Sequence, residues 1–290
     1  MSKSRDIIDF LAQRPAVRRD LQDAMSGALS EFLSKHGAFI PAAPYGEIQK
    51  ELPENYRFEA VEARLERDRA HFEAFFEELK AHFYSEALNA VPENAPEHDP
   101  QAVYWKNGYF SRADARALYA IAAVHNPGRW VEVGVGHSTR FLRKAIEEHG
   151  LQTRITSIDP APRAEIEGKT DEHIEQNLLD VPLDAFAALE AGDVFFLDGS
   201  HVMLQGTDVT HALLNVFPVL KPGVLVHVHD IYLPFEYPAA IRVKQFNEQH
   251  ALAAMLQFSD HWDVLLPVHF MRRTGMIEYG GGSFWMRKTA

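Results

Sequence analysis

Cysteine is absent from the 290 residues of this chain. Its absence excludes disulfide bonds, thiolate zinc sites, cysteine-ligated iron–sulfur clusters and a cysteine nucleophile. Any metal ion must therefore be bound by histidine, aspartate or glutamate side chains.

Long apolar runs and an excess of basic charge are absent as well. No uninterrupted apolar stretch reaches the ~18 residues that a membrane-spanning helix needs. Lys and Arg number 29 against 41 Asp and Glu, which gives a net charge of −12 and makes a phosphate-binding surface unexpected. The first 20 residues lack the apolar core and small-residue cleavage site of a secretory signal. We therefore expect a cytoplasmic protein that binds neither nucleic acid nor a membrane.

The N-terminal third has a helical pattern. Apolar residues recur at intervals of three and four over residues 17–36 and again over 56–90, which predicts a first helix and a long amphipathic helix. Prolines then break the pattern between residues 92 and 100. We predict a helical extension with a proline-rich connector over residues 1–100.

Strands and helices alternate over the rest of the chain, residues 101–290. Ser111 and Asp114 resemble a capping box that begins a helix, and Asn126 ends that helix. The pattern then predicts strands at 130–133, 155–158, 194–197, 224–228, 262–266 and 283–286, and helices at 138–149, 208–220 and 240–258. Repeated βα units of this length imply a mostly parallel sheet covered by helices on both faces.

Two glycines lie where the strand at 130–133 gives way to a helix. Gly134 and Gly136 let a ligand approach the backbone closely, although such a pair also serves simple tight turns. Asp159 ends the next strand, where an acid can bind both ribose hydroxyls; taken alone, it would be interpreted as a turn residue. Together with Glu132, these residues favour a nucleotide-like ligand.

At these residues the chain resembles the class I S-adenosylmethionine-dependent methyltransferases, over about residues 105–285. The segment Glu132–Gly136 matches the family's acidic-x-Gly-x-Gly motif, and Asp159 matches the acid that binds ribose. The segments 193–201, 220–223 and 229–230 resemble later motifs of the branch called methyltransferase family 24. The third glycine of the family loop is absent, and His137-Ser138-Thr139 stand in its place.

The resemblance implies a Rossmann-like α/β fold, with a seven-stranded, mostly parallel sheet whose last strand is antiparallel. It implies a methyltransferase that acts on a small molecule or a sugar, with oxygen as the favoured acceptor. The cofactor would be S-adenosylmethionine, with contacts from Glu132, Gly134, Gly136, Ser138, Asp159 and Asp198.

Polar residues follow two strands that the resemblance places side by side. Asp198 and His229 then share one pocket at the carboxyl edge of the sheet, where open α/β sheets bind ligands. His229, with Asp230 and His201, is the candidate for general-base catalysis. His227 alternates onto the same strand face as His229, and we expect it to be a buried core histidine.

The same cluster has a second use, as a site for a divalent metal ion. Related sugar and macrolide O-methyltransferases carry a metal on acids at the positions that match Asp198, His229 and Asp230. One of the three is a histidine here, and histidine suits zinc, iron or manganese better than magnesium.

Three other functions remain open from the sequence. Cephalosporin hydroxylase-like proteins are similar in fold and at Asp198, His229 and Asp230, and iron and 2-oxoglutarate dependence would reveal such an oxygenase. A dinucleotide oxidoreductase is permitted by the glycine pair but disfavoured by Glu132 and the closing strand pair. A non-catalytic protein would bind the cofactor without a substrate pocket. The charged helix around residues 62–69 is best explained as a solvent-exposed face, with contact in a homo-oligomer as the alternative.

Overall fold

The computed structural model describes residues 52–53, 55–99, 101–162, 167–242 and 244–290. The chain divides into two compact units, Met1–Pro53 and Glu54–Ala290. The helix predicted at 17–36 lies outside the described residues. The helical segment that follows it belongs to the same unit as the sheet, and the domain boundary at residue 100 stays a prediction.

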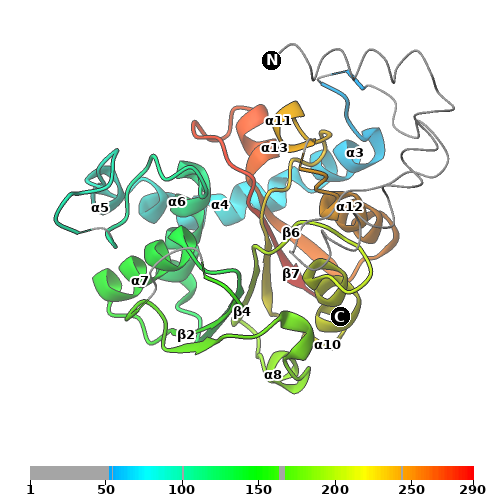
Figure 1. Cartoon of the computed structure of the whole chain (residues 1–290). Coiled ribbons are helices and arrows are strands. Elements are labelled where there is room, and N and C mark those ends of the chain that lie inside the picture. Colours follow the sequence, from blue (N-terminus) through cyan, green and yellow to red (C-terminus); the bar gives the residue numbers. More distant parts are fainter. Residues whose placement is uncertain (1–51, 54, 100, 163–166, 243) are drawn as a thin grey trace, which may run out of the picture. The chain divides into compact units, whose positions relative to one another are not determined.

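A seven-stranded sheet forms the centre of the second unit (Figure 1). Its spatial order is β3-β2-β1-β4-β5-β7-β6, and only the pairs that contain β7 are antiparallel. The predicted Rossmann-like sheet with an antiparallel last strand is therefore confirmed. The strand order reverses between β1 and β4, which is where such sheets bind ligands. The strands are β1 (Arg129–Val133), β2 (Arg154–Ile158), β3 (Glu172–Ile174), β4 (Val194–Leu197), β5 (Leu225–Val228), β6 (Trp262–Pro267) and β7 (Phe284–Lys288).

Helices cover both faces of this sheet. On one face α6 packs against both α4 and α7, whereas α8 and α10 lie across the sheet from them (Figure 1). The α-helices before β3 are α3 (Glu59–Arg67), α4 (Arg69–Phe83), α5 (Glu86–Asn89), α6 (Arg112–His125) and α7 (His137–His149). After β3 come η1 (Leu178–Asp180), α8 (Asp184–Ala187), α9 (Asp208–His211), η2 (Ala212–Val216), α10 (Phe217–Val219), α11 (Ala239–Arg242), α12 (Glu248–Phe258) and α13 (Val268–Arg273).

Three predicted helices are interrupted in the structure. The helix predicted at 56–90 breaks at Asp68, and α5 starts anew with the Ser85 hydroxyl as its cap. The helix predicted at 208–220 widens into the π-helix η2 just before Pro218, because proline has no N–H for the preceding carbonyls and its ring crowds them. The helix predicted at 240–258 becomes α11 and α12.

The predicted start of α6 at Ser111 and its predicted end at Asn126 are confirmed. The Ser111 hydroxyl accepts a hydrogen bond from the Asp114 backbone N–H at 3.3 Å, and Asn126 ends the helix with a left-handed φ of 43°. This fixes Asp114 in the first turn of a helix whose surface is largely buried.

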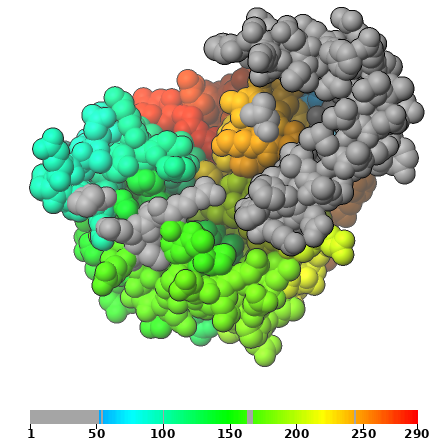
Figure 2. All heavy atoms as spheres, viewed as in Figure 1, coloured from blue at the N-terminus to red at the C-terminus, as the bar shows by residue number. Residues whose placement is uncertain are grey.

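The segment after β5 packs against α13. The rings of Tyr232 and His269 lie 5.1 Å apart, and the Arg273 guanidinium lies 4.4 Å from the centre of the Phe235 ring. In Figures 1 and 2 the golden α11, which follows this segment, adjoins the red-orange residues of α13 and the loop after it. Among the described residues, no helix has both the length and the apolar character needed to cross a membrane.

Candidate active site

The glycine loop between β1 and α7 adopts its shape for two different reasons. Gly134 has a left-handed φ of 83°, and a Cβ there would lie 1.9 Å from the carbonyl oxygen of Asp198. Gly136 has an extended backbone, and a Cβ there would meet nothing within 4 Å. The protein's own backbone thus requires glycine at Gly134, whereas open space lies in front of Gly136.

Asp159 ties the end of β2 to this loop. Its Oδ2 accepts a hydrogen bond from the Val135 N–H at 3.1 Å, and its Oδ1 accepts one from the Ala161 N–H at 2.8 Å. The residue is only partly buried. A carboxylate that faces the Gly134–Gly136 loop has remaining acceptor capacity for a hydroxyl-bearing ligand.

Glu132, at the end of β1, connects the start of α7 to β2 through hydrogen bonds. Its buried Oε1 accepts hydrogen bonds from the hydroxyls of Thr139 at 2.8 Å and Ser157 at 2.5 Å. The other oxygen, Oε2, is buried without a hydrogen-bond partner among the described residues. Burial raises the pKa of Glu132 to about 7. Ser138, beside Thr139, is buried in the first turn of α7.

Two imidazoles and a carboxylate converge at the ends of β4 and β5. His229 Nδ1 lies 3.2 Å from Asp198 Oδ1, and His201 Nε2 lies 3.3 Å from the same oxygen. Each of these three residues offers one potential metal-ligand atom, and these atoms all lie within 4.8 Å of one another. The structure therefore brings together Asp198, His201 and His229, as the sequence predicted for neighbouring strand ends.

Asp230 borders this group. Its Oδ1 lies 3.9 Å from His229 Nδ1, and its Oδ2 lies 3.9 Å from His201 Nε2. The Tyr232 hydroxyl donates a hydrogen bond to Asp230 Oδ1 at 3.4 Å. Asp230 and His201 both have a left-handed φ, of 54° and 62°, a conformation that costs energy for non-glycine residues and recurs at functional sites.

Opposite charges set the protonation of the cluster. Burial alone would lower the pKa of His201, but the charge of Glu248 and hydrogen bonds with Asp198 and Glu248 raise it to about 10. Burial opposes the charged form of His229 too, yet Asp198 and Asp114 raise its pKa well above the usual range. Burial would raise the pKa of Asp198, but the two imidazoles hold it well below its usual range. Both histidines therefore carry a positive charge at neutral pH when no metal is bound.

Two carboxylates of the cluster were not expected from the sequence. Asp114 Oδ2 lies 3.4 Å from His229 Nε2, and Glu248 Oε1 lies 2.6 Å from His201 Nδ1. Asp114 was assigned only to capping, and Glu248 lies in a region without any motif. Neither could be found from the sequence, because their helices α6 and α12 meet the sheet edge only in the folded chain.

His227 has the structural role that the sequence analysis gave it. Its ring stacks on Phe196 with centroids 3.8 Å apart, and its Nε2 is hydrogen-bonded to the Ser283 hydroxyl at 2.9 Å. Burial lowers its pKa well below the usual range, so it stays neutral in the core.

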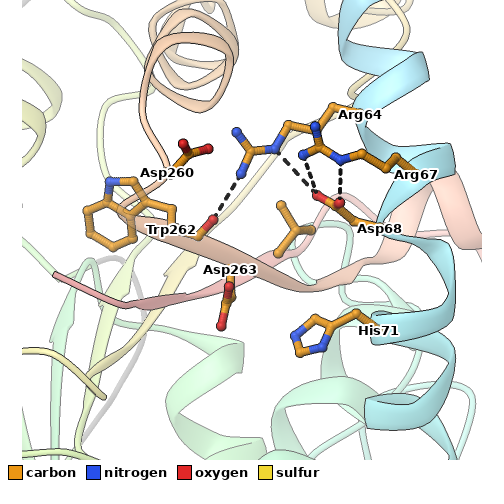
Figure 3. Close-up of a pocket in the computed structure, with 8 residues that line it drawn as sticks. Arg64, Arg67, Asp68, His71, Asp260, Trp262 and Asp263 are labelled. Carbon is orange, nitrogen blue, oxygen red and sulfur yellow. Dashed lines mark hydrogen bonds and ion pairs between the residues drawn. The ribbon is translucent and has the colours of Figure 1, made fainter.

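A hollow of about 260 Å³ lies apart from these residues, at the edge of the sheet formed by β6 (Figure 3). Arg64 points across it and donates hydrogen bonds to the carbonyls of Ser259 and Trp262 at 3.2 and 3.1 Å. Asp68 pairs with both Arg64 and Arg67. The Arg64 guanidinium thus links α3 to the turn between α12 and β6. None of the predicted site residues lines this hollow.

The match to a protein family covers the segment that carries the loop and the cluster. A family model described as "Methyltransferase domain" matches residues 131–231. The match confirms the resemblance found in the sequence and the prediction that the chain carries an enzyme domain.

An uncharacterized protein of Archaeoglobus fulgidus is 32% identical over 102 residues, which are 33% of this chain and 46% of that relative. The matched region thus spans about half of the relative's length. A SAH-bound methyltransferase of Podospora anserina is 14% identical with a TM-score of 0.40, covering 84% of this chain and 100% of the other. A methyltransferase of the mycinamycin biosynthetic pathway, in complex with Mg, SAH and mycinamycin VI, is 14% identical with a TM-score of 0.41, covering 69% and 55%.

Proposed function

From a chain that carries a methyltransferase domain over residues 131–231, we propose an S-adenosylmethionine-dependent methyltransferase that acts at oxygen on a small molecule or a sugar. One observation carries the proposal. The matched segment begins in β1 and ends directly after Asp230, so it contains both the glycine loop and the polar ends of β4 and β5. Both features lie at the carboxyl edge beside the point where the strand order reverses.

The loop fits the methyl donor in three respects. Open space lies in front of Gly136, Asp159 offers a partly exposed carboxylate for the ribose hydroxyls, and Glu132 Oε2 is buried without a partner among the described residues. Gly134 belongs to this loop, the Asp198 carbonyl lies against it, and Ser138 follows it in the first turn of α7. When bound, S-adenosylmethionine supplies an electrophilic methyl group next to a positive sulfur.

The imidazole cluster would handle the acceptor's proton. His229, with His201 or Asp230, is the proposed general base. Because neighbouring carboxylates raise the pKa of His201 to about 10 and that of His229 well above its usual range, the basic form accumulates only at alkaline pH without a metal. We expect the rate of the metal-free reaction to rise with pH from neutral upwards.

A divalent metal ion is the second proposed use of the cluster, and the one that we favour. Asp198 and His229 would provide a carboxylate oxygen and an imidazole nitrogen. The third ligand would be either the Asp230 carboxylate or the His201 imidazole, and both sets suit zinc, iron or manganese. An ion bound there would lower the pKa of an acceptor hydroxyl. It would have to displace protons from the imidazoles, so its affinity should rise with pH.

The donor set also favours one alternative function. Two histidines and one carboxylate, as in His201, His229 and Asp198, form the ligand type of non-haem iron oxygenases. A cephalosporin hydroxylase-like oxygenase that uses iron and 2-oxoglutarate is therefore the second candidate.

Calorimetric titration with S-adenosylmethionine, NAD and 2-oxoglutarate in parallel tests the proposal. We expect the wild type to bind S-adenosylmethionine, and Asp159→Ala to bind it about 10- to 150-fold more weakly, since a charge-assisted hydrogen bond contributes ~1.5–3 kcal/mol. Asp193→Ala is the matched control, because Asp193 also accepts two backbone N–H groups but precedes β4, at the amino edge. Binding of 2-oxoglutarate or NAD without S-adenosylmethionine would contradict the proposal.

Treatment with a chelator distinguishes the metal-dependent mechanism from the metal-free general base. If a metal acts there, a chelator should inactivate the enzyme reversibly, and Asp198→Asn and Asp230→Asn should each lose bound ion and activity together. If the base acts alone, chelation should change nothing. Full activity in both variants and in His229→Ala would move the substrate site away from this edge.

A further inference from the structure

Two buried carboxylates reach the imidazole cluster from outside the segment that matches the methyltransferase family. Asp114 comes from α6, before that segment, and Glu248 comes from α12, after it. Their residues are 1% and 2% exposed. Buried carboxylates at these depths need partners, because burial opposes their charged form.

Each carboxylate contacts one imidazole at the ring nitrogen that faces away from Asp198. Asp114 lies 3.4 Å from Nε2 of His229, while Nδ1 of the same ring faces Asp198. Glu248 lies 2.6 Å from Nδ1 of His201, while Nε2 of that ring faces Asp198. Each ring is thus held by a carboxylate at one nitrogen, and its other nitrogen faces Asp198 Oδ1.

Asp114 is itself fixed from three directions. Its Oδ1 accepts a hydrogen bond from the Ser283 N–H at 2.7 Å, and its Oδ2 accepts bonds from the Gly282 N–H at 3.1 Å and the Ser111 hydroxyl at 2.7 Å. A Cβ on Gly281 would lie 2.3 Å from Asp114 Oδ1. Gly281, shortly before β7, therefore leaves room for this carboxylate.

We propose that Asp114 and Glu248 are positioning residues, which fix the ring orientation of His229 and His201. The inference rests on the proposed function of the cluster. An imidazole ring can rotate and exchange its two nitrogens, and a carboxylate bound to one nitrogen removes that freedom. The arrangement holds the N–H at Nε2 of His229 against Asp114 and the N–H at Nδ1 of His201 against Glu248, so the other nitrogen of each ring stays toward Asp198. Removing such an orienting group typically costs 10- to 100-fold in activity or metal affinity.

The first test needs no substrate. Nitrogen-15 NMR of the histidine side chains, at one fixed pH, should show protonated Nε2 in His229 and protonated Nδ1 in His201, both with the slow exchange of buried hydrogen-bonded N–H groups. Asp114→Ala should shift the ring signals of His229 and leave those of His201 nearly in place. Glu248→Ala should do the reverse, and Glu248→Gln, which keeps an oxygen acceptor, should restore most of the wild-type spectrum.

The second test is kinetic. Both alanine variants should lower kcat about 10- to 100-fold while KM for S-adenosylmethionine changes less than about twofold, since the carboxylates do not touch the glycine loop. Asp193→Ala, the control at the amino edge, should change neither kcat nor the imidazole signals.

An unprotonated Nε2 in wild-type His229, or alanine variants with unchanged ring signals, would overturn the proposal. If Asp114→Ala does not fold, the wild-type spectrum and the two Glu248 variants still decide. A wild type that transfers no methyl group but shows the expected nitrogen pattern would refute the proposed function and leave the positioning role standing.

Discussion

The glycine loop and the imidazole cluster lie at one edge of the sheet, yet they are built differently. The loop is held by contacts among Glu132, Asp159 and nearby residues, several of them to backbone N–H groups. The cluster is held by contacts between side chains, and it needs Asp114 and Glu248 from helices far away in the sequence. The glycine loop is therefore held by residues of the single βαβ unit β1-α7-β2, whereas the imidazole cluster depends on tertiary packing.

The buried carboxylates of the two regions also differ in the charges that surround them. In the cluster, positive imidazoles hold the pKa of Asp198 well below its usual range despite burial. In the loop, Glu132 accepts hydrogen bonds from two hydroxyls, and burial raises its pKa to about 7. The comparison predicts that changes in the cluster act on chemistry, while changes in the loop act on stability and binding.

The largest effect is expected from His229→Ala. Loss of this imidazole should lower kcat about 10²- to 10⁴-fold, the range for removal of a general base, and leave affinity for S-adenosylmethionine nearly unchanged. Steady-state kinetics and calorimetry on the same preparation measure both quantities. A variant that keeps its kcat and loses cofactor affinity would reverse the contrast between the two regions.

Gly134→Ala should lower the free energy of unfolding much more than Gly136→Ala does. At Gly134 the left-handed φ costs ~1–2 kcal/mol for alanine, and the approach to the Asp198 carbonyl forces a backbone shift that costs ~1–3 kcal/mol more. We expect a loss of about 2–5 kcal/mol in the free energy of unfolding, measured by urea denaturation.

Gly136→Ala enters open space in an extended backbone, so its free energy of unfolding should change by less than ~0.5 kcal/mol. Its affinity for S-adenosylmethionine should fall if the donor occupies that space. Equal stabilities for the two variants would show that the close approach at Gly134 relaxes easily.

Glu132→Gln should remove a pH dependence of stability. Because folding raises the pKa of Glu132 from 4.5 to about 7, the folded state holds this proton more tightly than the unfolded state. The contribution to stability is complete below pH 4.5 and is lost as the pH rises through about 7, a change of about 3 kcal/mol.

Urea unfolding of wild type and Glu132→Gln between pH 4 and about 8 measures this difference. The raised histidine pKa values also reduce stability with rising pH, but between 6.5 and about 10, and they do so in both proteins. Parallel stability curves for the two proteins would show that Glu132 ionises in the folded state as easily as in solution.

The fold was largely accessible from the sequence because hydrophobic periodicity and strand-ending motifs are local signals. The strands at 130–133 and 194–197 and the cap at Ser111 were predicted within a residue or two. The break at Asp68 was not predicted, since the helical periodicity continues through it, and the π-helix before Pro218 was not predicted although the proline that causes it stands in the sequence. The prediction for residues 17–36 lies outside the described chain.

For the candidate site, the sequence by itself determined the groups that follow β1, β2, β4 and β5, because parallel strands all end at one edge. It placed Asp159, Asp198 and His229 at that edge, and their functional roles stay predictions. Only the tertiary structure decided how these groups are charged and oriented. The pKa of His229 depends on Asp114, which reaches it from α6, and no spacing in the sequence records a contact that forms between helices and sheet during folding.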